Sequence, residues 1–471
     1  MERNDLNGRR DSRIAGRSGW QWIIVGTALL VVLIAALLPR ARVHPPAQPA
    51  QSAVSEASNG PSSSGTGNAS TQPHRLHSSH QVSAEQVVAD KLARFAAERR
   101  EVVHRLARRA KVQVPAVVEG YFDALEAGRR EEALALFKHL SDLHRSPAGS
   151  ELQPFWRAIV EAQGAAEQVQ SWPAQQLLDY GNAVLGSLRP GMVYVGGTDP
   201  GCFIPLMLND TSDGEQHIML TQNALADGSY LDYLSALYGN QLTTLTSGDS
   251  ERAFADYVAD AQKRLLHDQS LPNEPPQVLP GEAISIEDGK VQVSGQVAVM
   301  LINERLLQNL MDSNPGLSFA LEESFPFKST YAKAAPLGPV MELGAASQNA
   351  LTPDTAAQTV AFWQDTTDQL LADPEGSGST SALNAYAKMM VAQANLLVSH
   401  DLAGEAEQTF RLADQLAPGN PEVVFQYVQL LMQQNRFADA QQVVAGALSA
   451  APENQQFQAL NQQLQLRASG K

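Results

Sequence analysis

Polar residues follow three short apolar runs of the sequence, where they could form a ligand-binding or catalytic site. Carboxylates can act as general acids and bases, and amides can hold a ligand through hydrogen bonds. If the three runs are parallel strands, their carboxyl ends meet at the sheet edge where such folds bind ligands. We therefore predict a candidate ligand-binding site without a catalytic assignment. Its members are Asp199 after MVYVGGT, Gln222 and Asn223 in HIMLTQN, and Glu322 and Glu323 in FALEES.

Each of these residues also has a structural interpretation. Thr198 and Asp199 could cap a helix that follows the first run. Glu322 and Glu323 point to opposite faces if their strand persists, so they cannot both serve as a paired acid and base.

Sequence motifs of known catalytic sites are missing. The glycines Gly196, Gly197 and Gly201 lack the G-x-G-x-x-G spacing of a dinucleotide loop, and there is neither an H-E-x-x-H motif nor a cysteine pair. The single cysteine, Cys202, is expected to fill the core. We predict no cofactor and no metal, and an enzyme is the less favoured class.

The elements that position these residues read as a small α/β domain. MVYVGG (192–197) is expected to be a buried strand followed by a helix, which is the repeating unit of a doubly wound sheet. Further strands are predicted at 217–223, 319–324 and 339–343, and a helix over 291–313. The last strand should be antiparallel, because residues 325–338 are too few for a crossover helix. The predicted domain, 189–345, is Rossmann-like.

This segment resembles a known class of proteins. GMVYVGGTDPGCFIPLMLND, HIMLTQNALADGSYLDYL, FALEESFPFKSTY and PVMEL follow one another in the order seen in the soluble portion of bacterial multi-spanning membrane proteins of the protein-mannosyltransferase-like class. The resemblance covers about 150 residues. It implies an accessory role in envelope glycan or glycoprotein assembly, since a chain with one predicted span lacks the membrane-embedded catalytic half.

The C-terminal part contains an internal repeat, because residues 387–420 and 421–454 align at a spacing of 34 residues. Small, larger apolar, small and proline residues recur at fixed positions, and the pattern resembles the tetratricopeptide repeat. The positions are Ala406, Phe410, Ala413 and Pro418 in the first copy and Ala440, Val444, Ala447 and Pro452 in the second.

The resemblance implies stacked helical hairpins whose groove binds protein partners. The alternative is an array that only packs on the α/β domain. A helix at 355–372 could belong to a preceding unit, with a Gly/Ser linker at 374–380 and a capping helix at 455–466.

The N-terminal region predicts a membrane anchor. Residues 20–38 are nearly all apolar and would span roughly 28 Å as a helix, close to the thickness of a bilayer core. Five arginines precede this run, so the amino terminus should remain cytoplasmic. Residues 39–83 are rich in Ser, Pro, Gly, Ala and Gln and read as a disordered linker. The expected location is a bacterial inner (cell) membrane, with periplasmic or extracytoplasmic C-terminal domains.

Charge argues against a nucleic-acid partner, since the chain has a formal net charge of −16. Residues 84–111 oppose this trend and read as one basic helix. We expect an ordinary solvated face there, because acidic residues are plentiful elsewhere, and binding of anionic lipid is the alternative. The basic residues are Lys91, Arg94, Arg99, Arg100, Arg105, Arg108, Arg109 and Lys111.

Together these features predict a mixed fold with one N-terminal transmembrane helix, α-helical hairpins, a Rossmann-like domain and a C-terminal α-solenoid. The favoured function is an anchored scaffold that recruits protein partners through its repeats. The alternative is an accessory enzyme or ligand-binding protein in envelope glycan or glycoprotein assembly that uses the sheet edge. The expected segments are 1–19 (cytoplasmic arm), 20–38 (span), 39–83 (linker), 84–188 (helical domain), 189–345 (α/β domain) and 350–471 (repeat domain).

Overall fold

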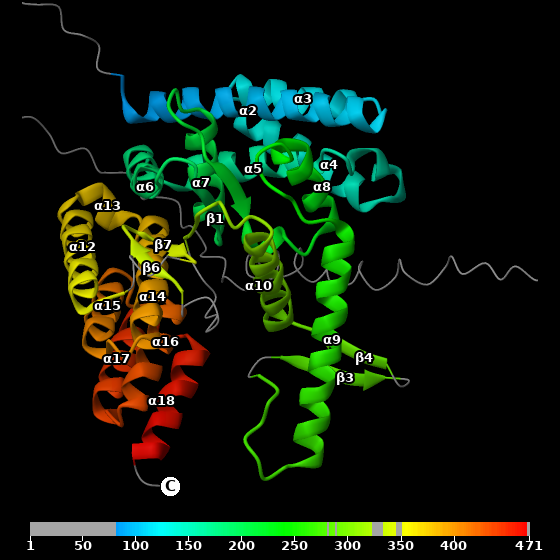
Figure 1. Ribbon diagram of the computed structural model, residues 1–471. Coiled ribbons are helices and arrows are strands. Elements are labelled where there is room, and N and C mark those ends of the chain that lie inside the picture. Colours follow the sequence, from blue (N-terminus) through cyan, green and yellow to red (C-terminus); the bar gives the residue numbers. More distant parts are fainter. Residues whose placement is uncertain (1–81, 280–281, 288–289, 323–332, 345–350, 469–471) are drawn as a thin grey trace, which may run out of the picture. The chain divides into compact units, whose positions relative to one another are not determined.

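Helices make up most of the chain in the computed structural model (Figure 1), which describes residues 82–279, 282–287, 290–322, 333–344 and 351–468. Within these ranges no helix is both long enough and apolar enough to cross a bilayer. The predicted span at 20–38 and the linker at 39–83 lie outside the described residues, except for the last two linker positions.

The segment predicted to be helical, 84–188, consists mainly of helices. Ser83 caps the first of them by accepting a hydrogen bond from the Gln86 N–H, and Lys111 ends it in the left-handed conformation (φ 58°). Phe155 is fully buried, whereas the adjacent Trp156 is only partly buried. The elements are α2 (Ala84–Ala110), α3 (Ala116–Glu126), α4 (Arg130–Arg145), η1 (Pro147–Leu152), α5 (Trp156–Ser171) and α6 (Ala174–Ser187).

A five-stranded mixed sheet follows, in the order β2-β1-β5-β7-β6. β1 pairs parallel with both β2 and β5, and β7 runs antiparallel to β5, as the short connection before it predicts. The edge strand β6 was not predicted; it is three residues long and contains Pro336, which is tolerated at a sheet edge. The strands are β1 (Val193–Gly196), β2 (Ile218–Thr221), β5 (Phe319–Leu321), β6 (Ala335–Leu337) and β7 (Val340–Leu343).

The helix predicted over 291–313 is wrong in its first part. Lys290–Ser294 forms strand β4, which pairs antiparallel with β3 (Ala283–Glu287), and the helix α10 begins only at Gln296. Gly295 separates the two elements at φ 92°, a conformation that glycine adopts readily. The hairpin packs beside α9, as Figure 1 shows. The helices of this region are α7 (Asp199–Asp210), η2 (Gln222–Ala224), α8 (Gly228–Tyr238), α9 (Ser247–Ser270) and α10 (Gln296–Asp312).

The sheet separates two apolar cores. Side chains alternate along β1, so Met192 and Tyr194 join one core while Val193 and Val195 join the other. The first core extends through α6 and the C-terminal helices, and the second lies among the helices between α2 and α10. The helical, α/β and repeat segments therefore share apolar cores.

The C-terminal segment consists of helices joined by short turns. Asp401 and Asn435, 34 residues apart, both adopt φ 60° in the turns within the two predicted repeats. The predicted Gly/Ser linker at 374–380 is wrong for its first part, because Asp373 caps a short helix there. The elements are α12 (Pro353–Ala372), α13 (Pro374–Gly378), α14 (Thr380–Ser399), α15 (Ala403–Leu416), α16 (Pro421–Gln433), α17 (Phe437–Ala450) and α18 (Gln455–Ala468).

Candidate functional site

The carboxyl edge of β1 and β5 holds a buried carboxylate, Glu322, that is 1% exposed. Its Oε2 accepts hydrogen bonds from the N–H groups of Gly197 (3.0 Å) and Thr198 (3.3 Å). Its Oε1 accepts from the hydroxyls of Thr198 (3.0 Å) and Tyr180 (2.8 Å). The N–H groups of Gly197 and Thr198, which could otherwise orient a bound anion at this turn, thus donate to Glu322.

The turn after β1 is shaped around this carboxylate. Thr198 caps α7 by accepting from the Gly201 N–H (3.2 Å), which is the structural role considered for it above. A side chain at Gly201 would collide with the Glu322 carboxylate, and one at Gly196 would approach the backbone of Gly201 and Cys202 too closely. A helix N-terminus commonly binds phosphate. Here the glycines bring an internal carboxylate to that position instead.

The other predicted site residues lie at the same edge at different depths. Asp199 and Asn223 are exposed at the rim, and the Asn223 side-chain amide donates to the Gly197 carbonyl (2.8 Å). Gln222 is fully buried, and neither its amide nitrogen nor its amide oxygen has a partner among the described residues. Glu323 lies outside the described residues. The structure therefore brings together four of the five candidates.

Charged residues from other elements surround this edge. Desolvation by the surrounding protein raises the pKa of Asp199, while the positive charges of Lys388 and Arg157 act to lower it. Lys388, on α14, also lies 3.9 Å from Glu422 at the start of α16, whose pKa is raised by desolvation. The sheet edge and the helical repeats therefore meet at Lys388.

A buried ionic network beside the sheet was missed from the sequence. Arg99 was expected on a solvated face, but it is 4% exposed and its Nη1 lies 3.3 Å from Glu161. It also pairs with Asp210, and the Tyr233 hydroxyl donates to Glu161 (2.7 Å). Arg157 reaches the same carboxylate at 3.3 Å. The partners come from α2, α5, α7 and α8, so this network joins helices distant in the sequence.

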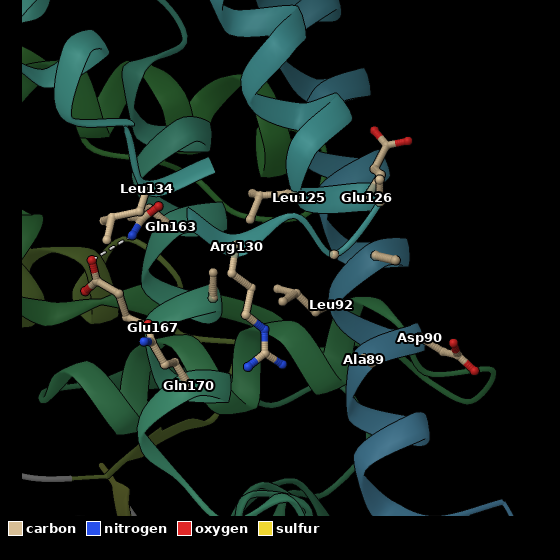
Figure 2. Close-up of a pocket in the computed structure, with 14 residues that line it drawn as sticks. Ala89, Asp90, Leu92, Leu125, Glu126, Arg130, Leu134, Gln163, Glu167 and Gln170 are labelled. Carbon is tan, nitrogen blue, oxygen red and sulfur yellow. Dashed lines mark hydrogen bonds between the residues drawn. The ribbon is translucent and has the colours of Figure 1, made fainter. Parts of the chain in front are cut away.

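A cavity of about 230 Å³ lies between α2, the α3–α4 turn and α5. Its floor is apolar, with Leu92 and Leu125, and Figure 2 shows Arg130 extending between α2 and the Glu167 and Gln170 side chains of α5. Glu167 accepts a hydrogen bond from Gln163 (2.8 Å). Acidic, basic and amide groups mix on this rim, so the cavity does not select one charge. Among the described residues, no group of three or more His, Cys, Asp or Glu could hold a metal.

The repeat-packing residues occupy the interfaces of the C-terminal helices. The two prolines fall just beyond the ends of α15 and α17, where proline cannot interrupt a helix. Thr367, which precedes Asp401 by 34 residues, lies within α12 and not in a turn, so α12 does not repeat the pattern. The buried members are Ala406, Phe410, Ala413, Ala440, Val444 and Ala447, each at most 1% exposed.

The first helix of the array, α14, is covered by the rest of the chain. No residue between 382 and 398 is exposed, and α14 contacts α6 and β7 as well as α12, α15 and α16. The Gln393 amide donates to the carbonyls of Gly338 (2.8 Å) and Val340 (2.9 Å) and accepts from the Trp363 indole N–H (2.8 Å). Helix α14 therefore packs on the α/β domain, as in the alternative in which the array has only a packing role.

The equivalent face of α16 is open. Phe425, Gln429 and Gln433 are exposed at four-residue intervals, so they lie on one side of the helix. The Phe425 ring lies 6.2 Å from that of Phe457 on α18, which exposes glutamines and Leu466. Across α16 and α18 the charged residues are only Glu422 and Arg467.

Comparison with known proteins matches only this C-terminal region. A family model for the tetratricopeptide repeat matches residues 398–464. Neither a curated protein nor a solved structure matches the chain. The resemblance of the α/β segment to mannosyltransferase-like proteins is therefore unsupported. The C-terminal region of this chain contains tetratricopeptide repeats, a class of helical repeat that generally binds protein partners.

Proposed function

We propose that this chain is a single-pass, membrane-anchored scaffold of the bacterial envelope that recruits partner proteins through its tetratricopeptide repeats. The repeat match over 398–464 supports protein–protein interaction. The anchor, the envelope location and the recruitment of partners belong to the proposal.

One observation carries the recruitment proposal: α14 is covered by the chain itself, whereas the corresponding faces of α16 and α18 are open. An array that served only to pack on the sheet would need no such exposed aromatic and amide surface. The partner surface is therefore assigned to α16 and α18, around Phe425, Gln429 and Leu466.

Residues 20–38 would form the anchor, with the amino terminus in the cytoplasm and the domains after the span in the periplasm or another extracytoplasmic space. The support is the length of the apolar run and the arginines before it. Full-length chain should stay with the membrane pellet after alkaline extraction, and a chain lacking 20–38 should be released. Release of both chains would contradict the anchor.

Site-specific cross-linking tests the recruitment surface. A photo-reactive residue placed at Gln429 should trap discrete partner proteins in native membranes, and Phe425→Glu in the same chain should remove those products. The matched control is the same probe at Gln442, which is exposed on α17. If the probes at 429 and 442 trap the same products, the surface on α16 is not specific and the proposal is wrong.

A ligand site at the sheet edge, the alternative considered above, has weaker support. The Glu322 carboxylate already accepts the donors of the β1–α7 turn. The one observation that favours a bound polar group there is the buried amide of Gln222, which has no hydrogen-bond partner among the described residues. We therefore place function in the repeats.

A further inference from the structure

The last turns of α2 present a basic face that the described part of the chain leaves without ionic partners. Arg105, Arg108 and Arg109 have the i, i+3, i+4 spacing of one helix face, and all three are exposed. They form no ion pair with any described residue, and neither does Lys111, the exposed C-cap. We expected an ordinary solvated face there because acidic residues are plentiful elsewhere in the chain. In the described part of the chain, none of those acidic residues pairs with this face.

Most other arginines in the described part of the chain are paired. Arg100, one turn earlier on α2, contacts Glu119, Asp123 and Glu126. Arg99 is buried among carboxylates. Glu101 is the one acidic residue of α2 after Glu98. Since the chain carries a net charge of −16, four unneutralised cations within seven residues form a distinct local field.

We infer that this face, Arg105, Arg108, Arg109 and Lys111, binds the headgroups of anionic lipids. The inference rests on the proposed membrane anchor. The overall negative charge disfavours nucleic acid, and the anchor would keep the face close to a bilayer. The face lies at the C-terminal end of α2, which is about 40 Å long and is the first described helix after the proposed anchor.

Basic residues near an anionic bilayer contribute about 1 kcal/mol each within a Debye length of the surface. Removing three charges should therefore reduce the ratio of docked to undocked protein on the order of 100-fold. Helix-dipole stabilisation by the same residues would not depend on lipid, so lipid dependence separates the two roles.

The test uses full-length protein reconstituted into vesicles of phosphatidylcholine, with or without an equal amount of phosphatidylglycerol. A fluorophore on Gln113→Cys, an exposed position beside the face, reports energy transfer to a headgroup-labelled lipid. The native Cys202 is buried, and burial raises the pKa of its thiol, so it should label slowly.

We expect stronger energy transfer in the vesicles that contain phosphatidylglycerol, and its loss at high salt. The variant Arg105→Gln, Arg108→Gln, Arg109→Gln should lose the lipid-dependent signal. The matched variant Lys138→Gln, Lys263→Gln, Arg467→Gln changes the same number of exposed charges elsewhere and should keep it. Equal signals from both vesicle types, or from both triple variants, would overturn the inference.

The same experiment distinguishes a wrong membrane anchor from a wrong lipid-binding face. If full-length chain does not incorporate into neutral vesicles, the membrane anchor is wrong. Binding to phosphatidylglycerol vesicles that disappears in the α2 variant alone still supports the lipid inference, and absence of such binding contradicts it.

Discussion

Four hydrogen-bond donors converge on Glu322, and together they hold the β1–α7 turn against β5. A carboxylate buried in this way is costly to remove, because its donors lose their partner without regaining water. Glu322→Ala should lower the free energy of unfolding by about 3 kcal/mol in chemical denaturation. Glu453→Ala, at an exposed position, is the control and should leave it unchanged. Similar stability of the two variants would show that Glu322 is dispensable for the turn.

Asp414, on α15, links the repeat region to pH. Burial raises its pKa from 3.8 to about 6, and its Oδ1 has no partner in the described part of the chain. The folded state therefore binds a proton on the Asp414 carboxyl more tightly than the unfolded state does. The stability that this protonation contributes is complete below about pH 4 and is lost as the pH rises through about 6.

Asp414→Asn should therefore raise the unfolding free energy at about pH 8, by about 1 kcal/mol after allowing for partial exposure, and have little effect at about pH 4. Thermal melts at the two pH values measure the difference. Asp365→Asn, an exposed aspartate on α12, is the control. An equal effect of Asp414→Asn at both pH values would exclude titration of this group as the cause.

At the scale of elements, Gln393 joins α14 to the β6–β7 turn and to α12. It is 0% exposed and makes three hydrogen bonds, two of them to main-chain carbonyls. Gln393→Ala should destabilise the chain by about 3 kcal/mol and speed amide hydrogen exchange in α14 and β7 more than in α17. Gln442→Ala, on the exposed side of α17, is the control. Equally faster hydrogen exchange in all helices would mean that the substitution lowers global stability and has no specific effect on the contact between α14 and β7.

The predictable elements are those whose signal is local. The runs at 192–197, 217–223 and 319–324 were recognisable as strands because buried parallel strands are short and apolar. The hairpin β3–β4 was missed, because the alternation in Lys290–Ser294 was read as part of the helix that follows Gly295. Two- and 3.6-residue periods are hard to separate over five residues.

The same limit applies to the candidate site. The position of four candidates at one sheet edge was predictable, because strand ends in a parallel sheet meet there. These are Asp199, Gln222, Asn223 and Glu322. The burial of Arg99 was not, since Glu161 and Asp210 are far away in the sequence and pair with it only in the fold. The covering of α14 likewise depends on contacts with β7 and α6 that no repeat pattern contains.

At the scale of the whole molecule, the repeats do not behave as a detachable unit. Tyr386 of α14 packs edge-on against Tyr180 of α6, with ring centroids 5.4 Å apart, and the Gln176 side chain bonds Asp373. Removal of the residues after 350 would expose Tyr180, Val340 and their neighbours.

A chain truncated after residue 350 should therefore melt at a lower temperature than the full-length chain, or aggregate, when followed by circular dichroism. The physical reason is the loss of a shared apolar core. An unchanged melting temperature would show that the remaining segments fold independently of the repeats. Point substitutions on α16 are consequently better probes of partner binding than truncation.

Helix α2 bears on how the molecule would carry mechanical load. Val88, Leu92 and Phe95 belong to the core that includes the repeats, whereas Val103 and Leu106 of the same helix belong to the other core. A pull on residue 83, with the repeats held by a partner, would thus enter through a helix packed into both cores. Such a force shears side-chain packing along 27 residues and does not peel strands from the sheet one hydrogen bond at a time. Helix α2 is thereby suited to transmit tension.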